Sequence, residues 1–209
     1  GRSVNIADIH KRLAPIKDKK IIVDGMQYFH GYINGVPTTL LGYHVTNPGI
    51  RHYLRRLLTT GTLGKRTDLV ISEAAEATRY GFGYKNAPIE SRAVPSFDTI
   101  DDLVIFYETL PADTWVHFHC HHGKGRTSMM LVMLDIMRNA PQVALEDIVK
   151  RQHLLGSSNL FDTSKWVGGT YTAEQLVSRK DFIMDFYAFV CQRKEGGIQK
   201  WSDWYKQRS

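Results

Sequence analysis

The sequence predicts an α/β fold in which helices flank a central, at least partly parallel sheet. Three observations predict it. Short strand-like runs alternate with helical patterns along the 209 residues. Residues 114–118 have the β-branched and aromatic side chains of a strand, and after a short loop residues 127–138 are almost wholly apolar, as in a buried helix. A hydrophobic content of 43% is typical of a globular domain. We expect residues 1–209 to form a single domain, either complete or one repeat or fragment of a longer protein.

The remaining elements follow from local patterns. Apolar runs predict strands at residues 20–23 and 68–71, and Asn34-Gly35 predicts a hairpin turn within residues 30–37. Helical spacing predicts helices at 6–13 and 48–59, one that contains Ala74, Ala75 and Ala77, and others at 99–110, 145–155, 173–194 and 201–206. Asn47 and Pro48 would begin the second of these, and Thr99 with Asp102 resembles a capping box for the fourth. We predict irregular structure for residues 81–95.

Composition limits the class of partner. The formal net charge is +6 and the isoelectric point is about 9.3, which favours anionic partners. The basic residues are scattered without an aromatic–basic recognition motif, so we do not expect nucleic acid to bind. The sequence has no run of 18 apolar residues, so it predicts no membrane span. The two cysteines, Cys120 and Cys191, do not suggest a disulfide framework.

The most informative segment is the loop from His119 to Ser128, between the predicted strand and the apolar helix. Cys120 and Arg126 are separated by five residues, of which Gly123 and Gly125 allow the backbone to approach a ligand closely. A strand, a tight loop and a helix in this order aim backbone N–H groups and the positive end of the helix dipole at one point. The pattern therefore predicts a phosphate site.

The side chains of this loop also predict a reaction. Arg126 can grip two phosphoryl oxygens at once. Amides, helix dipole and guanidinium together can lower the pKa of a thiol from about 8.5 to roughly 3.5–7.5, so we expect Cys120 to be a thiolate nucleophile that forms a phosphocysteine. The Thr127 hydroxyl would hydrogen-bond its sulfur. The alternative is a buried structural cysteine.

A metal site is a competing interpretation, because metal-ligand residue types are concentrated here. They are His117, His119, Cys120, His121 and His122. The contiguous arrangement lacks the paired spacing of structural zinc sites, so we expect neither a metal nor another cofactor. His119 would instead orient the loop.

Several longer segments carry a family resemblance. The Cys-x5-Arg loop resembles the protein tyrosine phosphatase superfamily. More narrowly, the chain resembles the protein-tyrosine-phosphatase-like inositol polyphosphatases, the cysteine phytases of bacteria. The segments that carry this resemblance are Asp24 with His30-Gly-Tyr-Ile-Asn-Gly-Val-Pro37, Phe106-Tyr-Glu-Thr-Leu-Pro111, Trp115-Val-His-Phe-His-Cys120, Arg151-Gln-His153, Phe186-Tyr-Ala-Phe-Val190 and Trp201-Ser-Asp-Trp204.

The resemblance runs from about residue 20 to the C-terminus. It implies a phosphatase-like fold and sequential hydrolysis of myo-inositol polyphosphates such as phytate, without a metal. For the location it implies a secreted or periplasmic bacterial protein, or a delivered effector. The residues themselves do not decide between these, nor do they give the oligomeric state.

The loop departs from the family pattern at His121, His122 and Lys124, where added positive charge suits a substrate with several phosphates. Lys124 is similar to the loop lysine of 3-phosphoinositide phosphatases. The predicted substrate-binding residues are His121, His122, Gly123, Lys124, Gly125, Thr127, Arg92 and Lys85, with Lys165 and Arg179 as further candidates. Each basic residue can equally be a solvated surface group.

A second departure concerns the proton donor. In the family, a loop aspartate four residues before a proline protonates the leaving oxygen. Counting back from Pro95, this position holds Ser91. Glu90, one residue earlier, is our candidate acid, with Asp98 a weaker one; the alternative is that no dedicated acid exists. Three functions stay open: an inositol polyphosphatase, a phosphotyrosine or phosphoinositide phosphatase, and a weakly active repeat that binds inositol polyphosphate.

Overall fold

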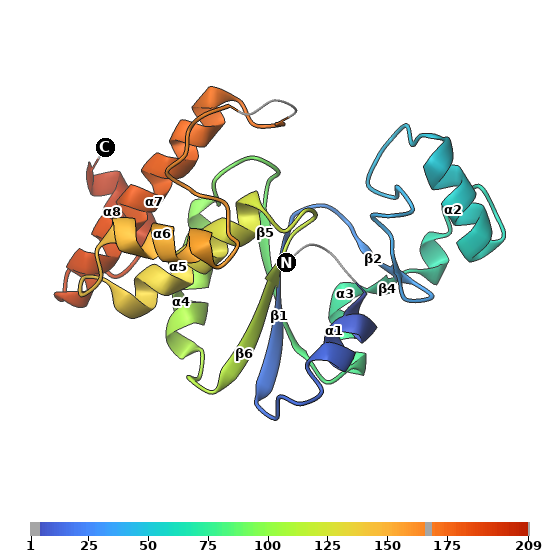
Figure 1. Ribbon diagram of the computed structural model, residues 1–209, viewed down its shortest axis with the longest axis horizontal. Helices are drawn as coiled ribbons and strands as arrows, with labels where there is room; N and C mark the ends of the chain where they lie inside the picture. Colours follow the sequence, from blue (N-terminus) through green and yellow to red (C-terminus); the bar gives the residue numbers. More distant parts are fainter. Residues whose placement is uncertain (1–4, 166–168, 209) are drawn as a thin grey trace.

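A parallel sheet of three strands, β5–β1–β6, lies at the centre of the molecule (Figure 1). The computed structural model describes residues 5–165 and 169–208. β1 (Lys19–Met26) pairs with β5 (Gly83–Ile89) on one side and with β6 (Thr114–His119) on the other. This arrangement confirms the predicted α/β class with a partly parallel central sheet. Because parallel strands end at the same edge, residues 24, 89 and 119 lie close together there.

Helices cover both faces of the sheet (Figure 1). Adjacent residues of β1 show the two layers: Ile22 packs with α1 (Ile6–Arg12) and α3 (Glu73–Arg79), whereas Val23 packs into the larger core on the opposite face. The larger core also takes its side chains from five helices, α4 (Phe97–Thr109), α5 (Gly125–Asn139), α6 (Leu145–Leu154), α7 (Ala173–Lys194) and α8 (Trp201–Arg208). No described helix has the length and apolar character needed to cross a membrane.

A small lobe follows β1 and extends to one side of the sheet (Figure 1). It contains an antiparallel sheet of β2 (Gly31–Ile33), β3 (Val36–Pro37) and β4 (Ile71–Ser72), together with α2 (Ile50–Thr60). Asn34 and Gly35 have φ angles of 50° and 73°, the left-handed values that a tight hairpin turn requires. The predicted hairpin is therefore confirmed.

The prediction of irregular structure at residues 81–95 was wrong for residues 83–89, which form β5, and holds for residues 90–95. β5 lacks the usual strand composition: it contains Gly83, Asn86 and Pro88, and few of its side chains are buried. Proline is tolerated because β5 is an edge strand. Residues 83–89 are a strand because they pair with β1, and the local sequence pattern does not reveal that pairing.

Three boundaries also differ from prediction. Residues 68–71 form a turn of 3-10 helix (Thr67–Leu69) and the start of β4, not a strand of the central sheet. α2 begins at Ile50, after the cap residue Gly49. Ser96 caps α4, and its Oγ accepts from the Thr99 amide at 3.3 Å. Thr99 itself donates to the Pro88 carbonyl at 3.2 Å, which ties α4 to the end of β5.

Candidate active site

The loop between β6 and α5 is shaped to hold an anion. β6 ends at His119 and α5 begins at Gly125, so the loop lies at the carboxyl edge of the sheet. Gly123 has a φ of 68°, which a side chain would disfavour. The N-cap residue Lys124 makes no side-chain hydrogen bond to the first turn of α5. The predicted loop geometry is present.

Cys120 is buried and its thiol is polarised toward the thiolate. Oγ1 of Thr127 donates to Sγ of Cys120 at 3.2 Å. Burial alone would raise the pKa of the thiol, but the Thr127 hydroxyl, the Arg126 charge and the amides of Thr127 and Gly123 together hold the pKa of Cys120 below its usual value. The site therefore favours a nucleophilic sulfur.

Arg126 is anchored beneath the loop by the other two strands. Its Nη1 donates to the carbonyl oxygens of Gly25 and Ile89 at 3.3 and 3.2 Å, at the ends of β1 and β5. Its side chain is buried. The guanidinium carbon lies 5.9 Å from the centroid of the Tyr28 ring. The loop follows β6, and its arginine is held by the ends of β1 and β5. The position of the guanidinium therefore depends on all three strands of the parallel sheet.

A cavity of about 580 Å³ opens above Cys120 and Arg126. It brings together several predicted residues, namely Arg92, His122, Lys124 and Gly125, and it is also lined by Ser91, Ser158, Gly169, Thr170, Tyr171 and Arg179. No Asp or Glu among the described residues lines it. The cavity is therefore cationic, and it offers no carboxylate as a proton donor.

Comparison with known proteins agrees with this geometry. The family model of protein tyrosine phosphatase-like phytases, described by the words inositol hexakisphosphate, matches residues 51–138. The uncharacterized protein AvrBs1.1 of Xanthomonas campestris pv. campestris is 35% identical over 92 residues, which cover 44% of this chain and 88% of that protein. The chain belongs to the protein tyrosine phosphatase-like phytase family.

Solved structures of this family share the fold. The tandemly repeated phytase of Mitsuokella multacida aligns with a TM-score of 0.75 and 25% identity over 99% of this chain. The myo-inositol phosphatase of the same organism, in complex with myo-inositol-(1,3,4,5)-tetrakisphosphate, aligns with a TM-score of 0.75 and 24% identity over 98% of this chain. This chain spans 40% of the length of each of them.

In this phytase-family chain, the loop after β5 presents Ser91 and Arg92 to the cavity. Arg92 has a φ of 70°, a left-handed value that is uncommon for a residue other than glycine. Its Nη1 donates to the Thr170 carbonyl at 3.3 Å, across the cavity mouth. Glu90 is exposed and does not line the cavity. The structure thus places the serine, not Glu90, on the cavity wall.

Three further predicted residues lie off this cavity. Lys85 does not line it, because its Nζ is 3.1 Å from Oδ2 of Asp102 on α4. The exposed Asp98 occupies the first turn of α4. The ring of His121 points instead toward the small lobe, where its centroid lies 5.4 Å from that of His44. The structure therefore gives no support to a direct substrate contact by Lys85.

Behind the loop, four ionisable side chains form a buried network. Nε2 of His30 lies 2.8 Å from both Oδ2 of Asp24 and Oε2 of Glu73. Nε2 of His119 lies 2.6 Å from Oε1 of Glu73. Nδ1 of His30 is 2.8 Å from the Tyr28 carbonyl, which can only accept. Nδ1 of His30 therefore carries a proton, and Nε2 lies at ion-pair distance from two carboxylates, which favours the positively charged ring.

Asp24, His30 and Glu73 also have the residue types of a metal site, with ligand atoms within 4.8 Å of one another. Tetrahedral zinc with bonds of about 2.0–2.1 Å would hold neighbouring ligand atoms about 3.3 Å apart. The 2.8 Å separations between His30 Nε2 and the two carboxylates are shorter than this and are those of close ion pairs. We interpret the cluster as an ion-pair network that supports His119, the residue before Cys120.

Two aromatic residues at the site were missed from the sequence. An ideal Cβ on Gly125 would lie 1.9 Å from the Tyr171 hydroxyl, so this ring covers the start of α5. The Arg179 guanidinium lies 5.4 Å from the Tyr171 ring centroid. The second aromatic residue, Tyr28, lies against Arg126. One signal in the sequence pointed to Tyr171. Arg179 shares the buried face of α7 with Leu176 and Ile183, and a buried arginine needs a partner, which here is the Tyr171 ring.

Proposed function

We propose that this chain hydrolyses phosphomonoesters of myo-inositol polyphosphates, phytate among them, through a phosphocysteine on Cys120. The observation that carries the proposal is a buried thiol directly after β6, with its pKa lowered and the Thr127 hydroxyl 3.2 Å from its sulfur. Membership of the phytase family supports the same chemistry. The inositol tetrakisphosphate bound by the Mitsuokella relative supports this class of substrate.

In the first step, the Cys120 thiolate attacks phosphorus from the side opposite the ester oxygen. The S–P bond forms and the P–O bond to inositol breaks, so the leaving oxygen takes the electron pair and needs a proton. Arg126 and the loop amides hold the non-bridging oxygens and stabilise the charge that develops on them. Binding and phosphoryl transfer therefore depend on the same loop.

In the second step, a water oxygen attacks the phosphorus of phosphocysteine. The S–P bond breaks, its electron pair returns to sulfur, and inorganic phosphate leaves. The Thr127 hydroxyl, which already donates to Sγ, stabilises the returning thiolate. A hydroxyl group at position 127 thus favours hydrolysis of the phosphocysteine.

The charge of the cavity favours a substrate with several phosphates. Arg92, Lys124 and Arg179 line it together with the phosphate-binding Arg126. A phosphotyrosine offers one dianion, which the loop alone can bind. Neighbouring phosphates on an inositol ring would engage the peripheral cations and gain affinity from each.

A second candidate function follows from the missing carboxylate. An inositol alkoxide is a poor leaving group, and general acid catalysis typically contributes about 10²–10⁴-fold. Ser91 lines the cavity and occupies the position at which the family carries an aspartate. No Asp or Glu among the described residues lines the cavity. This arrangement favours a domain that binds inositol polyphosphate and turns it over slowly.

The Cys120→Ser variant tests the mechanism. We expect it to bind phytate with an affinity close to wild type by calorimetry and to release no phosphate above background. Normal turnover by this variant would overturn the phosphocysteine mechanism. If the wild type binds phytate but releases phosphate only at background, the binding function replaces the enzymatic one.

A substrate panel separates the remaining alternatives. Phytate, lower inositol phosphates, soluble phosphoinositides and a phosphotyrosine peptide are compared by kcat/KM under one condition. We expect inositol polyphosphates to rank first, and Arg92→Ala to reduce kcat/KM for phytate more than for the peptide. A higher kcat/KM for the phosphotyrosine peptide or a phosphoinositide would assign that class instead.

A further inference from the structure

α2 carries its apolar side chains on the face that points away from the rest of the lobe. Ile50, Tyr53, Leu54, Leu57 and Leu58 share one helical face by their spacing. Ile50 and Leu58 are 77% and 87% exposed, and the other three are also exposed. Five large apolar residues on one helix face form a contiguous surface, which marks an interaction site.

The opposite, polar face of α2 is bound to the lobe through Arg56. Nε of this buried side chain donates to the Leu41 carbonyl at 2.9 Å. Nη1 and Nη2 donate to the carbonyl oxygens of Leu63 and Gly42 at 3.2 and 3.3 Å. The guanidinium also lies over the Tyr43 ring, 5.4 Å from its centroid. These contacts fix α2 with its apolar face outward, so the lobe cannot bury that face without breaking them.

The charged side chains of α2 and its flanking segments are basic within residues 44–67. Residues 44–67 contain five Arg or Lys residues and no Asp or Glu. Arg51 is exposed next to the apolar face. A surface complementary to this one is therefore apolar at its centre and acidic at its edge.

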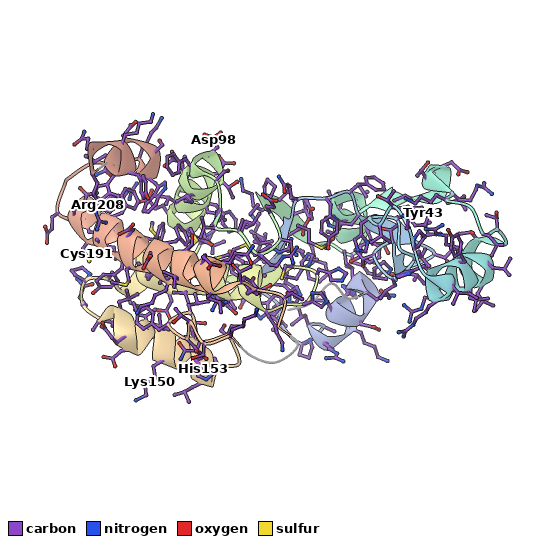
Figure 2. All side chains as sticks on the ribbon, turned by 90° about the horizontal axis from the view of Figure 1, so that it is seen from above. Tyr43, Asp98, Lys150, His153, Cys191 and Arg208 are labelled. Carbon is purple, nitrogen blue, oxygen red and sulfur yellow. The ribbon has the colours of Figure 1, made fainter. Side chains whose placement is uncertain are left out.

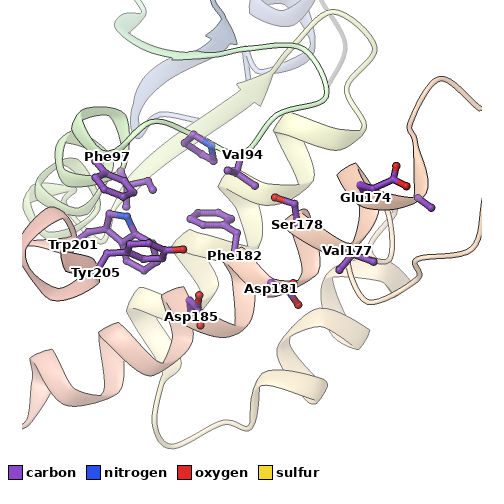
Figure 3. Close-up of a pocket in the computed structure, with 13 residues that line it drawn as sticks. Val94, Phe97, Glu174, Val177, Ser178, Asp181, Phe182, Asp185, Trp201 and Tyr205 are labelled. Carbon is purple, nitrogen blue, oxygen red and sulfur yellow. The ribbon is translucent and has the colours of Figure 1, made fainter. Parts of the chain in front are cut away.

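A groove with these properties lies on the same chain, between α4, α7 and α8 (Figure 3). Its volume is about 540 Å³, and aromatic rings form much of its wall. Three carboxylates line it, and no Lys or Arg of the described residues does. The apolar wall includes Val94, Phe97, Phe182, Trp201 and Tyr205, and the carboxylates are Glu174, Asp181 and Asp185.

We propose that the apolar face of α2 in one copy of this chain docks in the α7–α8 groove of a second copy. Figures 1 and 2 place α2 and the α7–α8 pair at opposite ends of the molecule, so a copy cannot fill its own groove. Ile50, Leu54 and Leu57 have the i, i+4, i+7 spacing by which an amphipathic helix enters a groove. This association is separate from the proposed phosphatase reaction and uses none of its residues.

The charges of the two surfaces match. The Asp181 side chain makes no hydrogen bond or ion pair with another described residue, whereas Asp185 pairs with Arg208. Asp181, unlike Asp185, is therefore available to meet Arg51 of the docked helix. Because two different surfaces pair, one docking contact leaves a free groove on the first copy and a free helix on the second, and assembly continues beyond the dimer.

Sedimentation velocity over about 1–200 µM tests the proposal, a range that covers modest affinities. We expect the mean mass of the wild type to rise with concentration beyond that of a dimer. Leu57→Glu and Asp181→Lys should each remain monomeric. Leu154→Glu is a matched control on α6, because Leu154 is 77% exposed and lies in neither surface. It should associate like the wild type.

Mixing the two deficient variants gives the decisive result. Leu57→Glu retains an intact groove and Asp181→Lys an intact helix, so an equimolar mixture should form a 1:1 heterodimer and stop there. No heterodimer, a monomeric wild type, or equal loss of association in Leu154→Glu would overturn the proposal.

Vesicles of three parts phosphatidylcholine to one part phosphatidylserine test the lipid alternative. A monomeric wild type that binds these vesicles, with binding lost in Leu57→Glu, would assign α2 to a membrane surface. Unchanged circular dichroism melting would show that the variants are folded.

Discussion

Nε2 of His119 lies 2.6 Å from Oε1 of Glu73, and His119 immediately precedes Cys120 in the chain. α3, on one face of the sheet, is thereby connected to the start of the phosphate loop. Glu73 also contacts His30, so one carboxylate lies against two imidazoles in a buried region. Glu73→Gln keeps the shape and removes the charge. We expect the free energy of unfolding to fall by about 3 kcal/mol or more, since breaking a buried ion pair leaves an uncompensated charge.

Urea unfolding followed by circular dichroism measures this loss. Glu195→Gln, at the exposed end of α7, is the control and should stay close to wild type. Equal stability of Glu73→Gln and the wild type would show that the network contributes little.

The same network predicts how stability depends on pH. Burial alone would lower the pKa of His30, but its contacts with Asp24 and Glu73 raise it from 6.5 to about 10. Its stabilisation is therefore complete below about pH 6.5 and is lost as the pH rises toward 10. Burial alone would raise the pKa of Glu73, but His119 and His30 lower it from 4.5 to about 2. That contribution is complete above about pH 4.5 and is lost as the pH falls toward 2.

We therefore expect the melting temperature to be highest between about pH 4.5 and 6.5 and to decline on the alkaline side. His30→Gln removes one source of this decline. Differential scanning fluorimetry from pH 4 to 10 compares the two proteins, and the alkaline decline should be smaller in the variant. Parallel curves for both proteins would contradict the assignment of a charged His30.

Gly125 and Tyr171 provide a test of the cavity wall. A Cβ on Gly125 would lie 1.9 Å from the Tyr171 hydroxyl, which is too close for both to stay in place. We expect Gly125→Ala to displace the ring and lower kcat/KM for phytate at least about tenfold, since a small misplacement in a site is costly. Tyr171→Phe in the same chain removes the clashing oxygen and should restore part of the loss.

A double-mutant cycle on kcat/KM measures this coupling. Gly49→Ala is the control, because a Cβ there meets nothing within 4 Å and the backbone conformation is ordinary. Additive effects of the two changes would mean that Tyr171 does not form the wall in solution.

The predictable parts of this molecule were contiguous in the chain. Cys120, Gly123 and Arg126 lie within one loop, and the strands beside it carry dense apolar runs, so both were found from the sequence. β5 was not predicted, because Asn86 and Pro88 are atypical of strands and because its pairing with β1 joins residues far apart in the sequence. Local composition does not record such pairing.

The same reason explains the missed support of the site. Glu73 begins an alanine-rich helix whose burial follows from packing against the sheet rather than from its own pattern. Tyr171 precedes α7 in a stretch without periodicity and reaches Gly125 only in the folded chain. Residues that act from distant segments are visible only when the sheet has brought them together.

The position of Glu90 predicts that it is dispensable. Its side chain is exposed and lies off the cavity, so Glu90→Gln should leave kcat and the pH–rate profile on phytate unchanged. Rates of phosphate release between pH 4 and 8 check this. A drop of about 10²-fold or more, the size of a lost general acid, would instead show that the loop moves to bring Glu90 to the substrate.

Ser91 predicts the converse, a gain of activity. It lines the cavity beside Arg92, and an aspartate there would place a carboxyl group where the leaving oxygen needs a proton. We expect Ser91→Asp to raise kcat for phytate by about tenfold or more, because general acid catalysis contributes about 10²–10⁴-fold at full effect. A new alkaline limb should appear in its pH–rate profile, since the acid must be protonated to act. Ser91→Asn has the same shape without a proton to give and should not gain, so equal rates in the two variants would place the missing step elsewhere.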